Sequence, residues 1–203
     1  MNIYDFDKTI LDGDTTYNFY FFCLRKKPSL ALGLFGMIIP SVKYFFGLCT
    51  KTQYKEKFYR FMSKIDCIAL LDEFWDENIK YIKKFYLKKK RDDDVIISAS
   101  PYFLLEPVAK RLGIKYLYAT NVDPKTGKHD GVNCHGEEKV RRFDAAGFSR
   151  GDAEEFYSDS LSDTPLAKIS KKAYIVIGEK LVPWEEYKLP FLKRIKRKLM
   201  ERK

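Results

Sequence analysis

The chain has 203 residues, of which 45% are hydrophobic and 16% aromatic. This content is enough to bury a core and excludes an intrinsically disordered protein. Its 38 lysine and arginine residues outnumber its 28 acidic residues, which gives a formal net charge of +10. The excess favours anionic partners, such as phosphorylated small molecules, anionic lipid surfaces or nucleic acid, and does not choose among them.

The cysteines and the start of the chain bear on where the protein resides. No two cysteines form a CxxC pair; they are Cys23, Cys49, Cys67 and Cys134. A stretch rich in carboxylates begins at the third residue, so we expect no cleaved leader ahead of it and a mature N-terminus at Met1. We therefore expect reduced thiols and a cytoplasmic protein.

The first half of the chain begins with a strand and continues with helices. Residues 2–5 predict a short strand that runs into the stretch "DFDKT". Within residues 15–91, "EKFYRFM" and "IALLDEFWDENIKYIKKFYLKKK" show helical spacing, and we see no strand signal there. At 92–100, "DDDVIISAS" has a charged entry and a β-branched run, which is typical of a buried parallel strand.

The segment "SPYFLLEPVAKRLG" predicts a helix directly after this strand. Ser100 is a candidate N-cap, with Pro101 at the first helical position. Gly113 predicts the end of the helix, and Pro107 is expected to kink or break it.

Strand and helix signals continue to alternate after this helix. "IKYLYAT" predicts a strand, "VDPKTGKHDG" a turn-rich excursion, and "EEKVRRFDAAG" a helix that ends at Gly147. "EEFYSDS" and "AYIVIG" predict two further strands around a short helix near residues 163–171. We predict an α/β fold, with a Rossmann-like parallel sheet flanked by helices. Residues 1–14 and 92–203 would form this core, and residues 15–91 an inserted α-helical cap.

Polar side chains follow four of the predicted strands, at the edge where open parallel sheets bind ligands. They are Asp5, Asp7 and Thr9; Ser98 and Ser100; Thr120 and Asn121; and Asp159, Ser160 and Asp163. Lys139, in the helix after Gly136, adds a cation. Acidic residues from two strands would repel one another unless a divalent cation neutralised them, and all-oxygen ligands suit Mg²⁺. The set predicts a site that holds a phosphate.

These motifs resemble, in order and on the same elements, the four motifs of the haloacid dehalogenase superfamily of phosphohydrolases. The motifs are "DFDKT", Ser98, Lys139 and "YSDSLSD", and the helical block lies where that family inserts a cap. The most similar branch is the phosphoserine-phosphatase-like group, with its "SAS" form of the second motif and the "GKHDGVNCHGEEK" approach to the third. Lys8 departs from the family pattern, which often has glycine there, and we interpret it as an influence on substrate choice.

The resemblance implies a role for each matched residue. Asp5 would attack phosphorus and form an aspartyl phosphate, and Asp7 would protonate the leaving alcohol and then deprotonate water. The implied phosphate-binding residues are Thr9, Ser98 and Lys139. Mg²⁺ would be held by Asp5, the backbone carbonyl of Asp7, and Asp159, with Asp163 as a supporting partner.

Several residues keep two interpretations. Ser100 is either a helix cap or adjacent to the substrate, and Asn121 either caps its strand or points to the leaving group. Cys134 and His135, in "NCHG", are interpreted as structural or substrate-adjacent, because no second cysteine lies at ligand spacing. Neither GxxxxGKS/T nor GxGxxG is present, so nucleotide-dependent transfer gains no support.

Residues 28–49, "PSLALGLFGMIIPSVKYFFGLC", contain a single charge, Lys43, and as a helix would approach the width of a bilayer core. One crossing would place the two halves of the sheet on opposite sides of the membrane. We therefore expect two short segments, broken at Pro40, that dip into one leaflet or lie in the interface. The alternative is a helix buried in the cap or in a dimer.

The C-terminal residues 188–203 hold eight basic residues against Glu201. Apolar residues fall on one helical face, namely Leu192, Ile195, Leu199 and Met200. This segment suits anionic lipid headgroups, and its alternative is a solvated tail whose apolar stripe packs on the core.

Taken together, the sequence predicts a Mg²⁺-dependent phosphomonoesterase at the inner face of the cell membrane. Bacterial phosphatidylglycerophosphate phosphatases resemble it in their core and apolar cap, so we expect a lipid phosphomonoester such as phosphatidylglycerophosphate. The alternatives are a soluble phosphatase for phosphoserine or phosphocholine, and a membrane or nucleic-acid binding module with a degenerate site. We expect no nucleic acid as partner.

Overall fold

The computed structural model describes residues 1–188, and the predictions for residues 189–203 lie outside this part of the chain. The strands are β1 (Asn2–Tyr4), β2 (Val95–Pro101), β3 (Tyr116–Thr120), β4 (Glu155–Ser158), β5 (Lys172–Ile177) and β6 (Lys180–Pro183). The α-helices are α1 (Thr15–Lys26), α2 (Leu32–Phe35), α3 (Ile38–Phe45), α4 (Lys51–Tyr59), α5 (Leu71–Asn78), α6 (Lys84–Lys89), α7 (Tyr102–Arg111), α8 (Glu137–Ala145) and α9 (Thr164–Ile169).

The strands form one sheet in the order β3-β2-β1-β4-β5-β6. Every neighbouring pair is parallel except β5 and β6, which form an antiparallel hairpin at the edge. This confirms the predicted Rossmann-like α/β fold. The sequence analysis did not predict β6, which follows a tight turn at Gly178 with φ of 59°.

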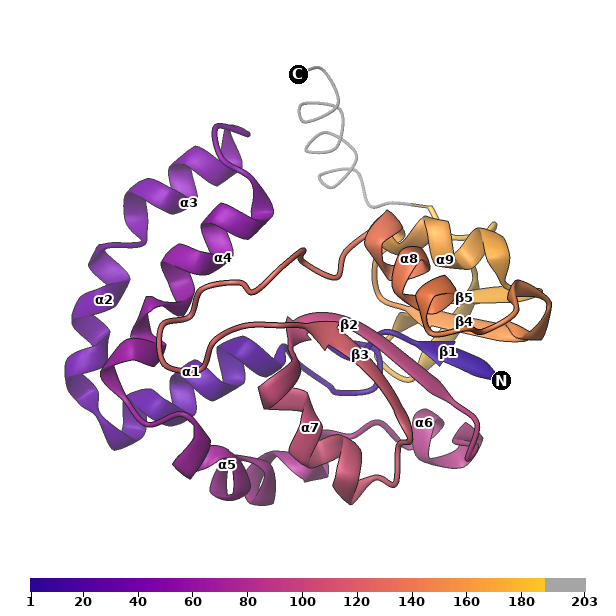
Figure 1. Ribbon diagram of the computed structural model, residues 1–203, viewed down its shortest axis with the longest axis horizontal. Helices are drawn as coiled ribbons and strands as arrows, with labels where there is room; N and C mark the ends of the chain where they lie inside the picture. Colours follow the sequence, from indigo (N-terminus) through magenta and orange to yellow (C-terminus); the bar gives the residue numbers. More distant parts are fainter. Residues whose placement is uncertain (189–203) are drawn as a thin grey trace.

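Alternate residues of the strands pack on opposite faces of the sheet, as the twofold side-chain period of a strand requires. Tyr4 and Ile96 belong to a core cluster with residues from α1, α5, α6 and α7. Ile3, Val95 and Ile97 belong to a second cluster with residues from α8 and α9. The sheet is therefore covered on both faces, and its carboxyl ends are left to carry the site (Figure 1).

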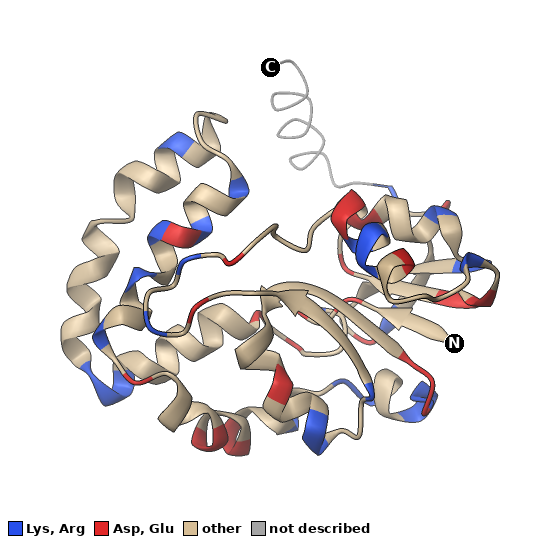
Figure 2. Ribbon diagram, in the orientation of Figure 1, with Lys and Arg blue, Asp and Glu red and all other residues tan. Residues whose placement is uncertain are grey.

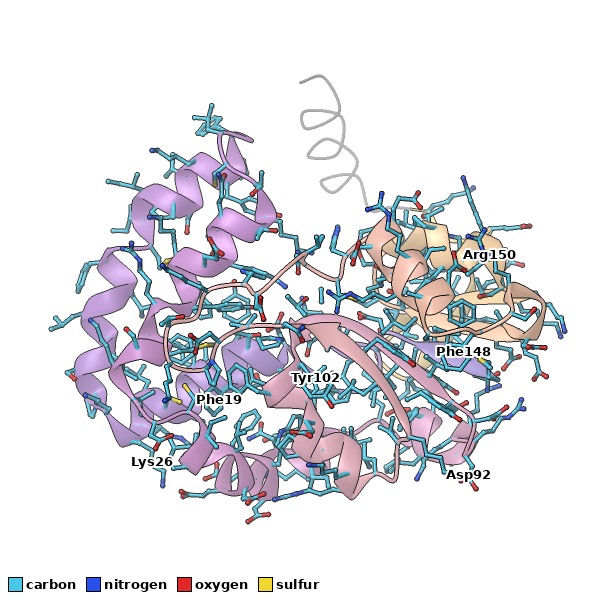
Figure 3. The ribbon with its side chains drawn as sticks, viewed as in Figure 1. Phe19, Lys26, Asp92, Tyr102, Phe148 and Arg150 are labelled. Carbon is cyan, nitrogen blue, oxygen red and sulfur yellow. The ribbon has the colours of Figure 1, made fainter. Side chains whose placement is uncertain are left out.

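The helical block packs directly on the sheet. Phe19 of α1, labelled in Figure 3, lies 5.2 Å from the ring of Phe74 in α5. Trp75, the next residue of α5, meets Phe6 after β1 with a ring separation of 6.0 Å. Within the described residues, 15–91 contribute helices and no strand to the sheet. The domain boundaries themselves stay a prediction.

The apolar segment is broken four residues earlier than predicted. The helical stretch Pro28–Phe35, which ends with α2, and the stretch Ile38–Phe45, which is α3, are bent by 46° at Gly36 and Met37, while Pro40 lies inside α3. A proline in the first turn removes no intrahelical hydrogen bond, because the N–H groups there have no partner in the helix. Across the described residues no single helix is both long and apolar enough for a bilayer crossing; only this bent pair passes, by length and composition.

The interpretation of residues 28–49 as a buried cap helix is wrong for this structure. Neither α2 nor α3 contains a buried residue. The exposed fraction is 70% for Leu32, 73% for Phe35 and 67% for Ile39. Figure 2 shows the two helices at the rim of the molecule with almost no charge. An apolar surface of this size calls for a partner.

Helix α7 begins later than predicted and passes through its proline. Ser100 and Pro101 belong to β2, so Ser100 is not the helix cap, and the helix has no side-chain cap. Pro107 lies within α7 without ending it, because buried Leu104 and Val108 hold the helix on the sheet on either side. Gly113, with φ of 64°, follows the last turn as predicted.

Candidate active site

The carboxyl ends of β1, β2 and β4 converge on one cavity of about 310 Å³, which we call the strand-end pocket. Most of the predicted site residues line it: Asp5, Asp7, Lys8, Ser98, Ser100, Lys139, Asp159 and Asp163. They meet because parallel strands place all their carboxyl ends at the same edge of the sheet.

Asp5 is held at the end of β1 by a backbone and a side-chain contact. Its N–H donates to the carbonyl of Tyr157 in β4 at 2.9 Å. Its Oδ1 accepts a hydrogen bond from Lys139 Nζ at 2.7 Å, and the same ammonium donates to Asp163 Oδ2 at 2.8 Å. Asp163 Oδ2 also accepts from Ser158 Oγ at 2.8 Å. Lys139 thus ties the first strand end to the fourth.

Burial and charge act in opposite directions in this cluster. Burial raises the pKa of Asp5 to about 7, with Lys139 opposing the shift and the nearby carboxylates Asp163 and Asp159 adding to it. Burial alone would lower the pKa of Lys139, but Asp163 and Asp5 together raise it above its usual value. The ammonium is therefore a permanent cation beside Asp5.

Asp7 is oriented by donors from two different elements. Its Oδ1 accepts hydrogen bonds from the N–H of Thr15, at 2.7 Å, and from the Thr15 hydroxyl, at the start of α1. Its Oδ2 accepts from the hydroxyl of Ser100 at the end of β2. Burial and the nearby Asp14 raise the pKa of Asp7 to about 6, although these hydrogen bonds oppose the shift. A carboxyl group that titrates near neutrality suits general acid and base catalysis.

The two serines of β2 have different roles in the pocket. Ser98 is buried, and its Oγ accepts the N–H of Ser100 at 3.2 Å, which leaves its hydroxyl proton to donate. The hydroxyl of Ser100 does not cap a helix; it donates to the carboxylate of Asp7. Of the two interpretations of Ser100, the structure thus favours the substrate-adjacent residue over the helix cap.

Two predicted site residues do not reach the pocket. Thr9 is fully buried in the turn after β1, and its Oγ1 has no hydrogen-bond partner among residues 1–188. Asn121 is exposed beyond the end of β3, and its backbone carbonyl accepts from Asp130 at 3.0 Å. Neither residue lines the pocket. Lys8 does line it, with a left-handed φ of 58° that favours glycine.

Helix α4 supplies pocket residues that the sequence analysis missed. Lys51 and Lys55, together with Tyr54 and Phe58, also line the pocket. Their spacing of three to four residues places them on one helix face, and this spacing is the only sign of the group that the sequence contains. Nothing in the sequence indicated that this face would turn toward the sheet.

The two candidate residues of "NCHG" have different surroundings: Cys134 is in the core and His135 is at the pocket. Cys134 is fully buried, and burial raises the pKa of its thiol to about 11, so it is not a reactive thiolate. His135 lines the strand-end pocket. All four cysteines are free thiols, as predicted.

The oxygen atoms at the strand ends fit a hard divalent cation. Within the described residues, no group of three or more His, Cys, Asp or Glu side chains is arranged to hold a metal. The predicted set needs only two carboxylates, Asp5 and Asp159, with the carbonyl of Asp7. Asp163 Oδ1 is buried with no hydrogen-bond partner among the described residues. A buried acceptor of this kind calls for a ligand or its water.

Comparison with known proteins identifies the family. A model of the haloacid dehalogenase-like hydrolases matches residues 3–168. The chain belongs to this family. The predicted superfamily is confirmed, and the match includes both the strand ends and the helical block of this haloacid dehalogenase-like hydrolase.

Two curated relatives come from Mycobacterium tuberculosis: an uncharacterized protein of strain CDC 1551 / Oshkosh and a protein named probable phosphatase Rv3661 of strain H37Rv. Each is 32% identical over 90 residues, which make up 41% of this chain and 31% of the relative. The match therefore spans less than a third of each relative's length. The second name agrees with the predicted phosphatase class.

Solved structures share the fold at low sequence identity. A protein with unknown function from Bordetella pertussis Tohama I has a TM-score of 0.70 and 22% identity, over 86% of this chain and 88% of that one. A phosphoserine phosphohydrolase-like protein from Francisella tularensis subsp. tularensis SCHU S4 has a TM-score of 0.55 and 18% identity, over 86% and 87%. A phospho-aspartyl intermediate analogue of phosphoserine phosphatase has a TM-score of 0.51 and 16% identity, over 85% and 84%.

Proposed function

We propose that the protein is a phosphomonoesterase that transfers the phosphoryl group of its substrate first to Asp5 and then to water. The observation that carries the proposal is the Lys139 ammonium, which bridges Asp5 and Asp163 in the same pocket as Asp7. Lys139 occupies Oδ1 of Asp5, so Oδ2 is the oxygen that attacks.

In the first step, an Asp5 oxygen bonds to phosphorus, the bond to the leaving oxygen breaks, and Asp7 gives its proton to that oxygen. In the second step, water attacks phosphorus and gives a proton to Asp7. The bond between phosphorus and Asp5 breaks, which releases phosphate and restores both carboxyl groups. Thr15 and Ser100 hold Asp7 in place for both transfers.

Charge on the phosphoryl oxygens would be met by the remaining groups of the pocket. Ser98 and Lys139 donate to these oxygens. Mg²⁺ is the cation that we propose for Asp5, the Asp7 carbonyl and Asp159, with Asp163 supporting it. When bound, it would offset the negative charge of the phosphate.

We propose a lipid phosphomonoester, such as phosphatidylglycerophosphate, as the substrate. A cavity of about 310 Å³ is at the small end of ligand pockets, which suits a head group and leaves acyl chains outside. Tyr44 of α3 lines the pocket, while Ile38, Ile39 and Val42 of the same helix are exposed. One helix therefore connects the pocket with an apolar surface where acyl chains would lie.

The same surface is the proposed contact with the cytoplasmic face of the cell membrane. We define the apolar surface as Leu32, Phe35, Ile38, Ile39 and Val42, all at least half exposed. Lys43 on α3 and Lys27 before α2 add cations beside it, which suits anionic headgroups.

A soluble phosphomonoester is the second candidate, because two fold relatives carry phosphoserine in their names. In that case a second copy of the chain would cover the apolar surface. A binding module with a degenerate site is disfavoured, because the contacts of Asp5, Asp7, Lys139 and Asp163 are intact.

Phosphate release from phosphatidylglycerophosphate in mixed micelles, measured beside phosphoserine and phosphocholine, tests this function. We expect Mg²⁺-dependent turnover of the lipid and none by Asp5→Asn. Faster turnover of a soluble ester would replace the lipid with the second candidate. Equal activity of Asp5→Asn would contradict the mechanism.

A further inference from the structure

Two lysines of the cap line the strand-end pocket. Lys51 and Lys55 are four residues apart on α4, so their side chains lie on one face of the helix, and both line the pocket. The mechanism above uses neither. Their presence above the reacting groups therefore needs its own explanation.

The two ammonium groups have carboxylates nearby, but in the described part of the chain neither is within ion-pair distance of one. Lys55 Nζ donates to the carbonyl of Ala99 at 2.6 Å, between the two serines of β2. Among residues 1–188, neither Lys51 nor Lys55 forms an ion pair, whereas Lys139 forms two, with Asp5 and Asp163. A neutral carbonyl positions the Lys55 ammonium without cancelling its charge.

The charges that line the pocket indicate that the ligand of these two lysines is an anion. Five aspartates and four lysines line it: Asp5, Asp7, Asp14, Asp159, Asp163, Lys8, Lys51, Lys55 and Lys139. A divalent cation at the strand ends would turn this balance positive, with the excess located on the cap side. An anion placed there would meet two cations in a partly enclosed cavity, where screening by solvent is reduced.

Burial beside Lys51 disfavours the charged form of Lys55, and it lowers the pKa of Lys55 to about 8. Lys55 is half-buried and Lys51 is exposed, and two like charges close together at a partly buried site are unfavourable until a counter-ion arrives. Binding of an anion between the two lysines removes this unfavourable interaction. The pocket is thus suited to a second negative group.

We propose that Lys51 and Lys55 form a second anion site, which selects phosphomonoesters whose leaving alcohol carries another negative group. This inference rests on the proposed function, because the scissile phosphate must lie at Asp5. The second group is a phosphodiester, as in a lipid head group, or a carboxylate, as in a soluble metabolite. The shared chemistry is an anion a few bonds away from the ester oxygen.

The test compares ligands that differ only in the second group. The probes are propane-1,3-diol monophosphate, the same molecule with a methyl phosphodiester on its free hydroxyl, and 3-phosphonooxypropanoate, in which a carboxylate replaces the CH2OH group. We expect the protein to bind the phosphodiester probe and the carboxylate probe, which each carry a second negative group, at least about tenfold more tightly than the monophosphate. Calorimetry on Asp5→Asn gives these affinities without turnover, and kcat/KM of the active enzyme gives the corresponding specificity.

Lys51→Met and Lys55→Met should each reduce this affinity ratio by about tenfold, since each removes one charged partner. Lys51→Arg should restore most of it, and the far-ultraviolet circular dichroism spectrum checks folding. Lys57→Met is the matched control, because Lys57 is an exposed lysine of α4 outside the pocket.

An affinity ratio that is unchanged in both methionine variants would overturn the inference, even if the enzyme hydrolyses every probe. Loss of the ratio for only the phosphodiester or only the carboxylate probe would support the site and identify its anion. Absence of turnover with an intact affinity ratio would contradict the proposed function and leave the anion site standing.

Discussion

At the residue scale, Lys8 shows how the turn after β1 is constrained. It has a φ of 58°, and its backbone accepts from the Lys83 ammonium. A left-handed conformation costs a non-glycine residue about 1–2 kcal/mol in the folded state, and glycine would remove this cost. Part of the gain in stability would be lost, because glycine also makes the unfolded chain more flexible. We expect Lys8→Gly to stabilise the protein by about 0.5–1 kcal/mol, measured by urea unfolding. Lys8→Ala is the control and should give no gain. A less stable glycine variant would contradict this account of the turn.

Lys55 makes anion binding depend on pH. Its pKa is lowered to about 8 by burial, with Asp7, Asp14 and Asp5 opposing the effect of Lys51. The protonated form binds anions, so affinity should be constant below about pH 8 and fall above it. The expected fall in affinity is tested by measuring the dissociation constant of the phosphodiester probe from about pH 7 to about pH 9.5, a range that includes this pKa. Lys55→Arg should abolish the decline, because arginine stays protonated throughout. An identical decline in Lys55→Arg would assign it to another group.

At the element scale, the excursion between β3 and α8 fixes the position of α4. A Cβ at Gly127 would lie 2.4 Å from the backbone oxygen of Tyr59, at the end of α4. His129 stacks on the Tyr59 ring at 5.7 Å, and its N–H donates to Glu56 at 3.3 Å. The turn-rich "GKHDG" stretch therefore holds the helix that carries Lys51 and Lys55.

Gly127→Ala should destabilise the protein by about 2 kcal/mol or more, because it combines a positive φ of 71° with this clash. Gly131→Ala is a matched control, since its φ of 88° is also positive but no atom of residues 1–188 lies within 4 Å of the added Cβ. We expect it to cost only about 1 kcal/mol. Thermal unfolding of both variants decides, and equal losses would mean that the excursion does not depend on contact with α4.

The apolar surface of α2 and α3 should bind bilayers. Phe35→Ser and Ile39→Ser each remove exposed apolar area, and each should weaken binding by about tenfold. Cosedimentation with vesicles that contain anionic lipid measures this. Leu87→Ser is the control, because Leu87 is a half-exposed leucine on α6, outside the apolar surface. Unchanged vesicle binding, together with loss of a dimer in the two variants, would assign the surface to a second copy of the chain.

At the scale of the whole molecule, the sheet explains which site residues the sequence could predict. Asp5, Asp7 and Asp159 follow strands, and Ser98 lies near the end of one, whose order and direction bring their ends together, so the local sequence pattern was sufficient. Thr9 shares that sequence neighbourhood, but its N–H bonds back to Phe6 at 3.2 Å, and the tight turn carries it into the core.

The cap could not be predicted to the same depth. The direction in which Lys51 and Lys55 face is fixed at the end of the same helix, where Phe58 packs on Tyr17 of α1 and Tyr59 stacks on His129 of the excursion after β3. The rotation of α4 is thus set by tertiary packing, which a helical period does not contain. The same holds for Ser100. Its local sequence favours a helix cap, but its hydroxyl instead donates to the carboxylate of Asp7 at the end of a neighbouring strand.

The measurement that tests the central claim most directly is a search for the phosphoryl group on the enzyme. The protein is mixed with its fastest substrate and Mg²⁺, quenched in acid during the first turnovers, digested, and examined by mass spectrometry. We expect a phosphoryl group on the peptide that contains Asp5, and none in Asp5→Asn. Rapid phosphate release by the unmodified protein with no labelled peptide, or with the label on another residue, would contradict the assignment of Asp5 as the nucleophile.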